Sequence, residues 1–235
     1  MKKHIPNFIT SLNLASGFMA SIYALEGDLI TASWLIVAAM VFDFLDGFSA
    51  RILRAYSDIG KELDSLADIV SFGVAPALII YRLIDRSLSP DISSVVLFSV
   101  VIMPVCAALR LAKFNIDETQ TKSFKGLPTP ANALAVISVV IAAHYGEPGI
   151  LTKFTGSVLA LVLFTVILSL LMVTRLPLLS LKTNHAKFKG NEGRYVLILM
   201  SAAAFALLGL KAAPLIIPLY IIASLLSLLF NKSTG

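Results

Sequence analysis

Eight apolar segments, each close to the ~20 residues needed to cross a bilayer core, dominate this sequence. They cover residues 6–25, 29–52, 61–84, 92–113, 128–146, 152–174, 194–210 and 212–230. Only 14% of the 235 residues are charged, against about 25% in soluble domains, which is too few to cover a water-exposed surface of this size. The sequence therefore predicts an all-α, polytopic transmembrane helix bundle of about eight helices, forming a single domain over residues 1–235. The last two segments are the least clearly separated, since almost no loop divides them.

Basic residues gather at one end of the predicted helices. With the N-terminus in the cytoplasm, 15 of the 19 lysines and arginines fall inside: Lys2, Lys3, Arg51, Arg54, Lys61, Arg110, Lys113, Lys122, Lys125, Arg175, Lys182, Lys187, Lys189, Arg194 and Lys232. Those predicted outside are Arg82, Arg86, Lys153 and Lys211. Since cytoplasmic loops are enriched in basic residues, this asymmetry predicts a multi-pass protein of the cell membrane in that orientation. The net charge of +5 then reflects topology and contact with anionic lipids, and no nucleic-acid partner is expected.

Four aspartates interrupt the second and third apolar segments. Asp43 and Asp46 are three positions apart and Asp64 and Asp68 are four apart, so each pair lies on one helix face. The short segment 52–59 allows the two helices to fold back as antiparallel neighbours, so that the pairs meet near the cytoplasmic surface. A charge within a membrane costs about 2.5–3.5 kcal/mol on insertion scales, so the four carboxylates need compensation. Oxygen ligands with no histidine or cysteine nearby predict Mg²⁺ or Mn²⁺, or else Ca²⁺, and two ions would balance the charge.

Small and basic residues surround these carboxylates. Gly47, Ala50 and Gly60 leave the helix surfaces open, so that a bulky pyrophosphate can approach the metal and neighbouring helices can pack closely. Arg51 and Lys61 are candidates to touch phosphate, although they could merely mark the cytoplasmic side. The group as a whole predicts phosphoryl-transfer chemistry, in which positioning and charge stabilisation matter most.

The core motif over residues 43–68 reads Asp-x2-Asp-Gly-x2-Ala-Arg-x8-Gly-x3-Asp-x3-Asp, and it resembles the motif of the CDP-alcohol phosphatidyltransferase family without a departure. The resemblance implies a membrane enzyme in which a CDP-linked lipid reacts with an alcohol, forming a phosphodiester and releasing CMP. It also implies that the four aspartates hold a divalent metal pair and that Asp68 is the general base toward the acceptor hydroxyl. A homodimer is implied as well.

Two polar residues one turn apart in the first segment, Thr10 and Asn13, are predicted to hydrogen-bond the cytidine or the pyrophosphate, with polar helix packing as the alternative. The full set of residues predicted to bind the CDP-lipid is Thr10, Asn13, Asp46, Gly47, Ala50, Arg51, Gly60 and Lys61.

Four further stretches are similar to the membrane-integral phosphatidylserine synthases: residues 5–14, 71–76, 110–115 and 124–131. The similarity extends over about residues 5–182 and implies CDP-diacylglycerol and L-serine as substrates. A planar guanidinium matches the serine carboxylate. The residues predicted to bind serine are therefore Arg110, Lys113, Gly126 and Pro128. The alternatives are that the two basic side chains extend to lipid headgroups, and that the glycine and proline only form a turn.

Two other functions stay open from the sequence. A related synthase using glycerol 3-phosphate or an inositol phosphate, or an archaeal ether-lipid serine synthase, would carry the same motif. A phosphorylated acceptor, however, needs a denser basic pocket than the motif region offers. A divalent-cation transporter would also place carboxylates in the membrane, but it needs a continuous path, and the aspartates cluster toward one surface.

Overall fold

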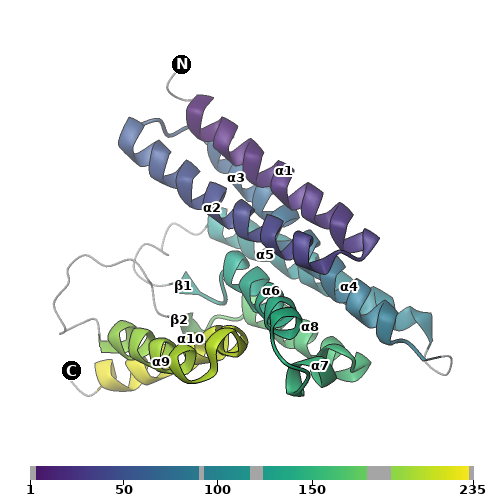
Figure 1. Ribbon diagram of the computed structural model, residues 1–235. Coiled ribbons are helices and arrows are strands. Elements are labelled where there is room, and N and C mark those ends of the chain that lie inside the picture. The colour runs from purple at the N-terminus through teal and green to yellow at the C-terminus, as the bar shows by residue number, and fades with distance from the viewer. Residues whose placement is uncertain (1–3, 90–92, 117–123, 179–191, 233–235) are drawn as a thin grey trace.

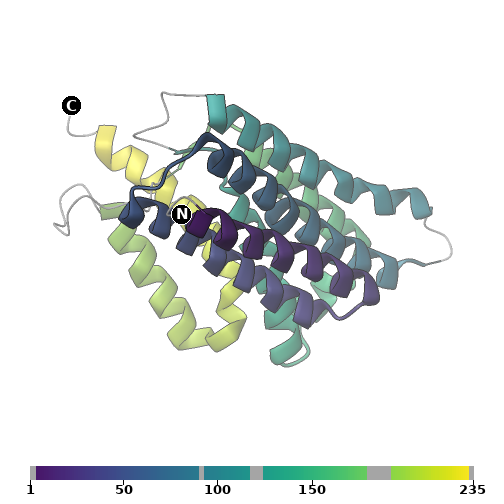
Figure 2. The same cartoon turned by 90° about the horizontal axis from the view of Figure 1, so that it is seen from above.

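The computed structural model describes residues 4–89, 93–116, 124–178 and 192–232, which form a helical bundle (Figures 1 and 2). The α-helices are α1 (His4–Glu26), α2 (Leu29–Leu53), α3 (Asp58–Asp68), α4 (Ala75–Ser87), α5 (Ile102–Ile116), α6 (Thr129–Tyr145), α7 (Ile150–Thr155), α8 (Val158–Val173), α9 (Glu192–Leu208) and α10 (Ile216–Lys232). Three further segments are helical but not α-helical. The segment η1 (Ile69–Val74) is a wider π-helix, and η2 (Ser94–Val101) and η3 (Gly209–Leu215) are tighter 3₁₀-helices. Strands β1 (Phe124–Lys125) and β2 (Pro177–Leu178) pair antiparallel.

Five of these helical stretches are long and apolar enough to cross a membrane: His4–Glu26, Leu29–Leu53, Asp58–Ser87, Ser94–Ile116 and Gly193–Ser227. The helices α6 and α8 are shorter but also apolar. Since a spanning helix needs about 20 apolar residues, this pattern confirms the prediction of a polytopic transmembrane bundle.

The last two predicted segments are two helices, α9 and α10, of 17 residues each. They contact each other across the turn η3, where Gly209 has a φ of +57° and Pro214 lies inside the 3₁₀ helix. In Figure 2 the two helices, α9 in yellow-green and α10 in yellow, are joined by this turn. The seventh and eighth segments therefore fold back on each other.

Helix α1 packs along both α2 and α3, and it contacts each of them more extensively than they contact each other (Figure 1). Small residues make this close approach feasible. A Cβ atom on Gly17 would lie only 2.6 Å from the Cα of Ser71, so α1 comes almost into backbone contact with η1. The two helices that carry the aspartates are thus held together largely through α1.

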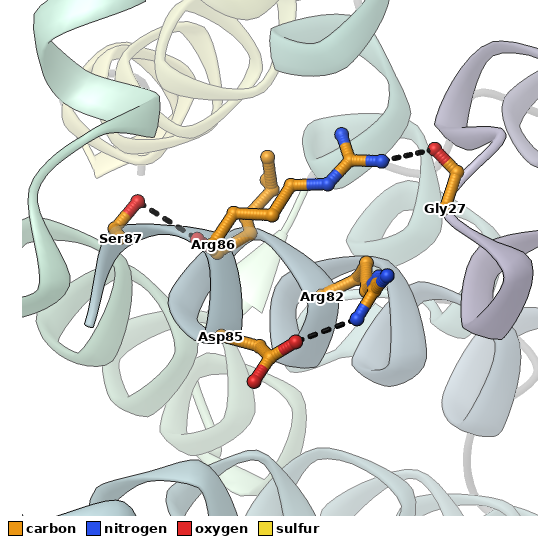
Figure 3. Close-up of polar contacts among 6 residues, drawn as sticks. Gly27, Arg82, Asp85, Arg86 and Ser87 are labelled. Carbon is orange, nitrogen blue, oxygen red and sulfur yellow. Dashed lines mark hydrogen bonds and ion pairs between the residues drawn. The ribbon is translucent and has the colours of Figure 1, made fainter.

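The end of the bundle far from the aspartates is fixed by charged side chains (Figure 3). The Arg86 guanidinium donates to the carbonyl of Gly27 in the turn between α1 and α2, and Arg82 pairs with Asp85 at 2.6 Å. In that turn Asp28 caps α2 by accepting from the backbone N–H of Thr31 at 3.0 Å, and its hydrogen bonds with Thr31 lower the pKa of this carboxyl.

The same end holds the other two basic residues predicted outside. Lys211 lies 3.4 Å from Glu147, in an ion pair between η3 and the segment after α6. Lys153 lies in α7, which is tied to the end of α4 by the hydrogen bond from Ser87 to the Thr155 carbonyl. The four basic residues predicted outside thus share one end of the bundle. Of those predicted inside, Lys2, Lys3, Lys122, Lys182, Lys187 and Lys189 lie outside the described residues.

Candidate active site

Three of the four aspartates direct carboxylate oxygens at one another. Asp43 projects from the second half of α2, while Asp64 and Asp68 lie in the last two turns of α3. One oxygen from each residue lies within 4.8 Å of the other two. The i, i+4 spacing in α3 puts both of its carboxylates on one face. This spacing between oxygens is close enough for one cation to be held by all three residues.

Asp46 lies beside this group and not within it. Its side chain is buried, lines the same cavity as Thr10 of α1 and interacts electrostatically with Asp64. Among the described residues, Asp46 Oδ2 and Asp64 Oδ1 are buried without a hydrogen-bond partner. Unpaired buried carboxylate oxygens are costly, and a set of oxygen ligands without nitrogen or sulfur is the environment that hard divalent cations prefer. The residues present therefore fit such an ion.

A cavity of about 480 Å³ opens next to Asp46 and Asp64. It is lined by Pro6, Asn7, Thr10, Asp46, Gly47, Ala50, Arg51, Ala55, Tyr56, Ser57, Gly60, Lys61, Asp64 and Phe114. Every residue predicted to bind the CDP-lipid lines this cavity except Asn13. The volume lies in the range of small-molecule and cofactor sites.

The two motif glycines act differently in the cavity wall. A Cβ atom on Gly47 would meet nothing within 4 Å, so this position leaves open space as predicted. A Cβ atom on Gly60 would lie 2.9 Å from both Asn7 Oδ1 and Ser57 Oγ. Ser57 caps α3 by accepting from the Gly60 N–H at 3.1 Å. Gly60 therefore allows the start of α3 to approach α1.

The basic residues of the motif lie at the rim. Arg51 is exposed, and its Nε donates to the Gly47 carbonyl at 2.9 Å. Lys61 is exposed too, and its Nζ donates to the Asn115 carbonyl at the end of α5, also at 2.9 Å. Both side chains border the cavity from the solvent side, where they can reach a phosphate by a rotamer change.

Asn13 points toward Asp68 rather than into the cavity. It is fully buried, and its Nδ2 donates to Asp68 Oδ1 at 3.5 Å. The sequence predicts a contact with cytidine or pyrophosphate here. The structure instead places the amide beside the most buried member of the acidic group.

The predicted serine-binding residues separate into two groups. Arg110 of α5 is buried with 8% of its surface exposed, and it interacts electrostatically with Asp68 and with Tyr220 of α10. Its Nε has no hydrogen-bond partner among the described residues. Lys113 is exposed near the end of α5. Arg110 is thus the predicted serine-binding residue that is buried and whose charge interacts with that of Asp68.

Gly126 and Pro128 shape the chain before α6. Gly126 has a φ of +78°, its N–H donates to the Leu176 carbonyl at 2.9 Å, and a Cβ atom there would lie 2.6 Å from the Met172 carbonyl. Pro128 is the residue immediately before α6. Neither residue lines the cavity. Both residues thus form the turn that precedes α6, and their contact with serine stays a prediction.

The sequence profile described as CDP-alcohol phosphatidyltransferase matches residues 3–173. The chain belongs to this family. Its aspartates, its cavity and Arg110 all lie within the matched range. Membership in a family of membrane transferases identifies the chain as a multi-pass membrane enzyme, and it decides against the cation-transporter alternative.

Individual relatives are similar over most of the chain. A protein of Helicobacter pylori strain J99 named CDP-diacylglycerol–serine O-phosphatidyltransferase is 33% identical over 240 aligned positions, covering 97% of this chain and 95% of the relative. A Bacillus subtilis protein of the same name is 33% identical over 192 positions, covering 82% and 98%. The archaetidylserine synthase of Methanothermobacter thermautotrophicus is 34% identical over 145 positions, covering 61% and 60%.

The sequence alone did not identify some of the residues that line the cavity of this CDP-alcohol phosphatidyltransferase. Asn7 lies one turn before Thr10 on the same face of α1, a spacing that could have identified it. Tyr56 and Phe114 come from different segments and carry no periodic signal. Asn132, which does not line the cavity, was also not identified, because it is a single polar residue, fully buried in the first turn of the apolar helix α6.

Proposed function

We propose that this chain transfers the phosphatidyl group of CDP-diacylglycerol to the hydroxyl of L-serine, forming phosphatidylserine and CMP. The names of the relatives from Helicobacter pylori and Bacillus subtilis, which match most of both chains, support the reaction. The observation that carries the choice of acceptor is a buried arginine, Arg110, next to the acidic group.

The bond changes follow from the substrates. The serine hydroxyl oxygen forms a bond to the lipid-bearing phosphorus of the pyrophosphate, and the bond from that phosphorus to the oxygen of CMP breaks. The hydroxyl proton passes to a carboxylate, for which Asp68 is our choice, because it is buried, receives a hydrogen bond from Asn13 and interacts electrostatically with Arg110. A positioned base of this kind contributes about 10²- to 10⁴-fold to a rate.

The nucleotide end of the donor fits the cavity beside Asp46 and Asp64. Thr10, Gly47 and Ala50 provide a wall with space for phosphate, while Arg51 and Lys61 provide positive charge at the rim. The exposed apolar side chains of the bundle suit a lipid environment, so the acyl chains can stay in the membrane while the head group enters the site.

Asp43, Asp64 and Asp68 are the proposed ligands of a divalent cation, with Asp46 completing a site for two ions of Mg²⁺ or Mn²⁺. When bound, such ions neutralise the pyrophosphate and its leaving group. Ca²⁺ has the same preference for oxygen and is the alternative.

Serine differs from the competing acceptors in its charges. Its carboxylate matches the guanidinium of Arg110, which is held near Asp68 in a buried position. Glycerol 3-phosphate and inositol phosphate carry a dianionic phosphate, for which one buried arginine is a weak match. The archaetidylserine synthase relative supports the same acceptor on an ether lipid as the second candidate function.

We also propose that the site faces the cytoplasm and that the protein is a homodimer of the cell membrane. The orientation is supported by the four basic residues that share the end of the bundle opposite the aspartates. The residues 1–235 are proposed to form one catalytic membrane domain.

One acceptor assay tests the proposal. Purified protein is mixed with CDP-diacylglycerol, Mg²⁺ or Mn²⁺ and one of three acceptors: serine, glycerol 3-phosphate or an inositol phosphate. The proposal predicts CMP release with serine alone, and repeating the assay with a CDP-linked ether lipid separates the two donor classes. CMP release with a phosphorylated acceptor and not with serine would refute the acceptor assignment.

A further inference from the structure

The helix that carries Asp68 does not continue regularly beyond it. Helix α3 ends at Asp68, the π-helical turn η1 follows, and α4 begins at Ala75. The N–H of Ala75 donates to the Val70 carbonyl, five positions back instead of four. An extra residue is therefore inserted into the helix directly after the proposed base.

Pro76 explains why the irregularity lies here. In an α-helix, the carbonyl of Phe72 would accept from the N–H of residue 76, but a proline has no N–H and its ring clashes with the carbonyl four residues earlier. Inserted residues and prolines are recognised causes of such breaks in a helix. The Phe72 carbonyl thus loses its regular donor in a fully buried position.

Asn132 supplies the missing donor. Its Nδ2 donates to the Phe72 carbonyl at 3.1 Å, from the first turn of α6, and the residue is fully buried. The two residues are 60 positions apart in the sequence. A side chain from another helix therefore donates to the carbonyl that Pro76 cannot serve.

Two further contacts hold the same turn. Ser71 Oγ donates to the backbone carbonyl of Asn13 at 3.0 Å, and the Asn13 side chain donates to Asp68. On the other side, a Cβ atom on Gly73 would lie 3.1 Å from the Cβ of Ala107 in α5. Helices α1, α5 and α6 thus enclose η1, and the only side-chain hydrogen bond from α6 to this turn among the described residues comes from Asn132.

We infer that Asn132 is a positioning residue: by donating to the Phe72 carbonyl, it fixes the π-helical turn that directs the Asp68 carboxylate. Asn132 acts through the backbone of Phe72. The inference rests on the proposed function in one respect, the role of Asp68 as the base. π-Helical turns occur frequently at functional sites, where they aim a side chain that a regular helix would point elsewhere.

The test replaces Asn132 by leucine, which is similar in size and has no donor. The expected result is a kcat about 10- to 100-fold lower, with the KM values of both substrates within about twofold of wild type, because displacement of a catalytic group impairs the reaction step. The matched control is Ser138→Ala, since Ser138 is equally part of α6, is buried, and donates only to the Ala135 carbonyl of its own helix. This control should keep the wild-type kcat.

Pro76→Ala provides a second measurement. Because Pro76 and Asn132 act on the same carbonyl, the losses in kcat should not add, and the double variant should be no slower than the slower single variant. Additive losses, or a wild-type kcat for Asn132→Leu, would overturn the inference.

If Asn132→Leu does not fold, Asn132→Ala is assayed, and failure of both to fold would assign Asn132 to stability and also overturn the inference. An inactive Asp68→Asn together with a fully active Asn132→Leu refutes only this inference, whereas a fully active Asp68→Asn refutes the proposed base.

Discussion

The amide nitrogen of Asn13 lies 3.5 Å from the Oδ1 atom of Asp68, and both side chains are buried. This contact joins the first helix to the acidic group and gives one of its carboxylates a neutral donor. A donor at this position stabilises the charged form of a carboxylate that is surrounded by other carboxylates. Several experiments follow from it and from the cavity beside it.

Replacing Asn13 by leucine should lower kcat about tenfold, since the change removes a hydrogen bond to a charged group, a contact worth about 1.5–3 kcal/mol. Ser11→Ala is the matched control on the same helix, because Ser11 is exposed and donates only to the Asn7 carbonyl. Steady-state kinetics with saturating CDP-lipid would check this. Equal kcat values for the Asn13 variant and the control would show that the contact with Asp68 is not used in turnover.

Asp64→Asn should weaken Mn²⁺ binding by more than about tenfold, because even the outer partners of metal ligands change affinity 10- to 100-fold. Asp58→Asn is the control, since Asp58 lies exposed in the first turn of the same helix. Titration calorimetry of the detergent-solubilised protein gives both affinities, and chelation followed by addition of Mn²⁺ should abolish and then restore turnover. Identical Mn²⁺ affinity in wild type and Asp64→Asn would exclude Asp64 as a ligand.

Arg110→Lys should raise the KM for serine by about tenfold or more while leaving the KM for CDP-diacylglycerol unchanged, because lysine lacks the planar fork that binds a carboxylate. Leu109→Ala, at the neighbouring position of the same helix, shortens a half-exposed side chain and should change neither KM appreciably. An unchanged KM for serine in Arg110→Lys would argue against the carboxylate contact.

Two glycines should respond in opposite ways to larger side chains. Gly47→Leu should raise the KM for CDP-diacylglycerol without lowering stability, because a Cβ atom there meets nothing within 4 Å and the side chain enters the cavity. Gly17→Ala should destabilise the fold by about 1–3 kcal/mol, because its Cβ would lie 2.6 Å from the Ser71 backbone. Thermal unfolding and donor kinetics on both variants would separate the two effects, and a stable, fully active Gly17→Ala would contradict the tight packing.

Local spacing made the acidic group predictable. The i, i+3 and i, i+4 pairs define helix faces, and the apolar segments define where the helices run, so the four carboxylates were expected to meet; three of them do, and Asp46 lies beside them. The same spacing predicted that the small and basic residues of the motif surround the carboxylates, and these residues line the cavity. These features depend on residues close in the sequence.

Contacts between distant segments were not predictable in this way. The role of Asn132 depends on a carbonyl 60 positions away, and the direction of the Asn13 side chain depends on how α1 packs against α3 and η1. The positive φ of Gly126 and its close approach to the end of α8, next to the pairing of β1 with β2, also depend on segments far apart in the sequence. The packing of the helices against one another determines these contacts, and the hydropathy pattern of the sequence does not predict that packing.

The most direct measurement of the central claim compares wild type with Asp68→Asn for turnover and for donor binding in the same preparation. Wild type is expected to convert CDP-diacylglycerol and labelled serine into equal amounts of CMP and labelled phosphatidylserine. Asp68→Asn is expected to lose about 10²- to 10⁴-fold in kcat while largely retaining its affinity for the CDP-lipid. Turnover by Asp68→Asn at the wild-type rate, or no CMP release by folded wild-type protein with serine, would contradict it.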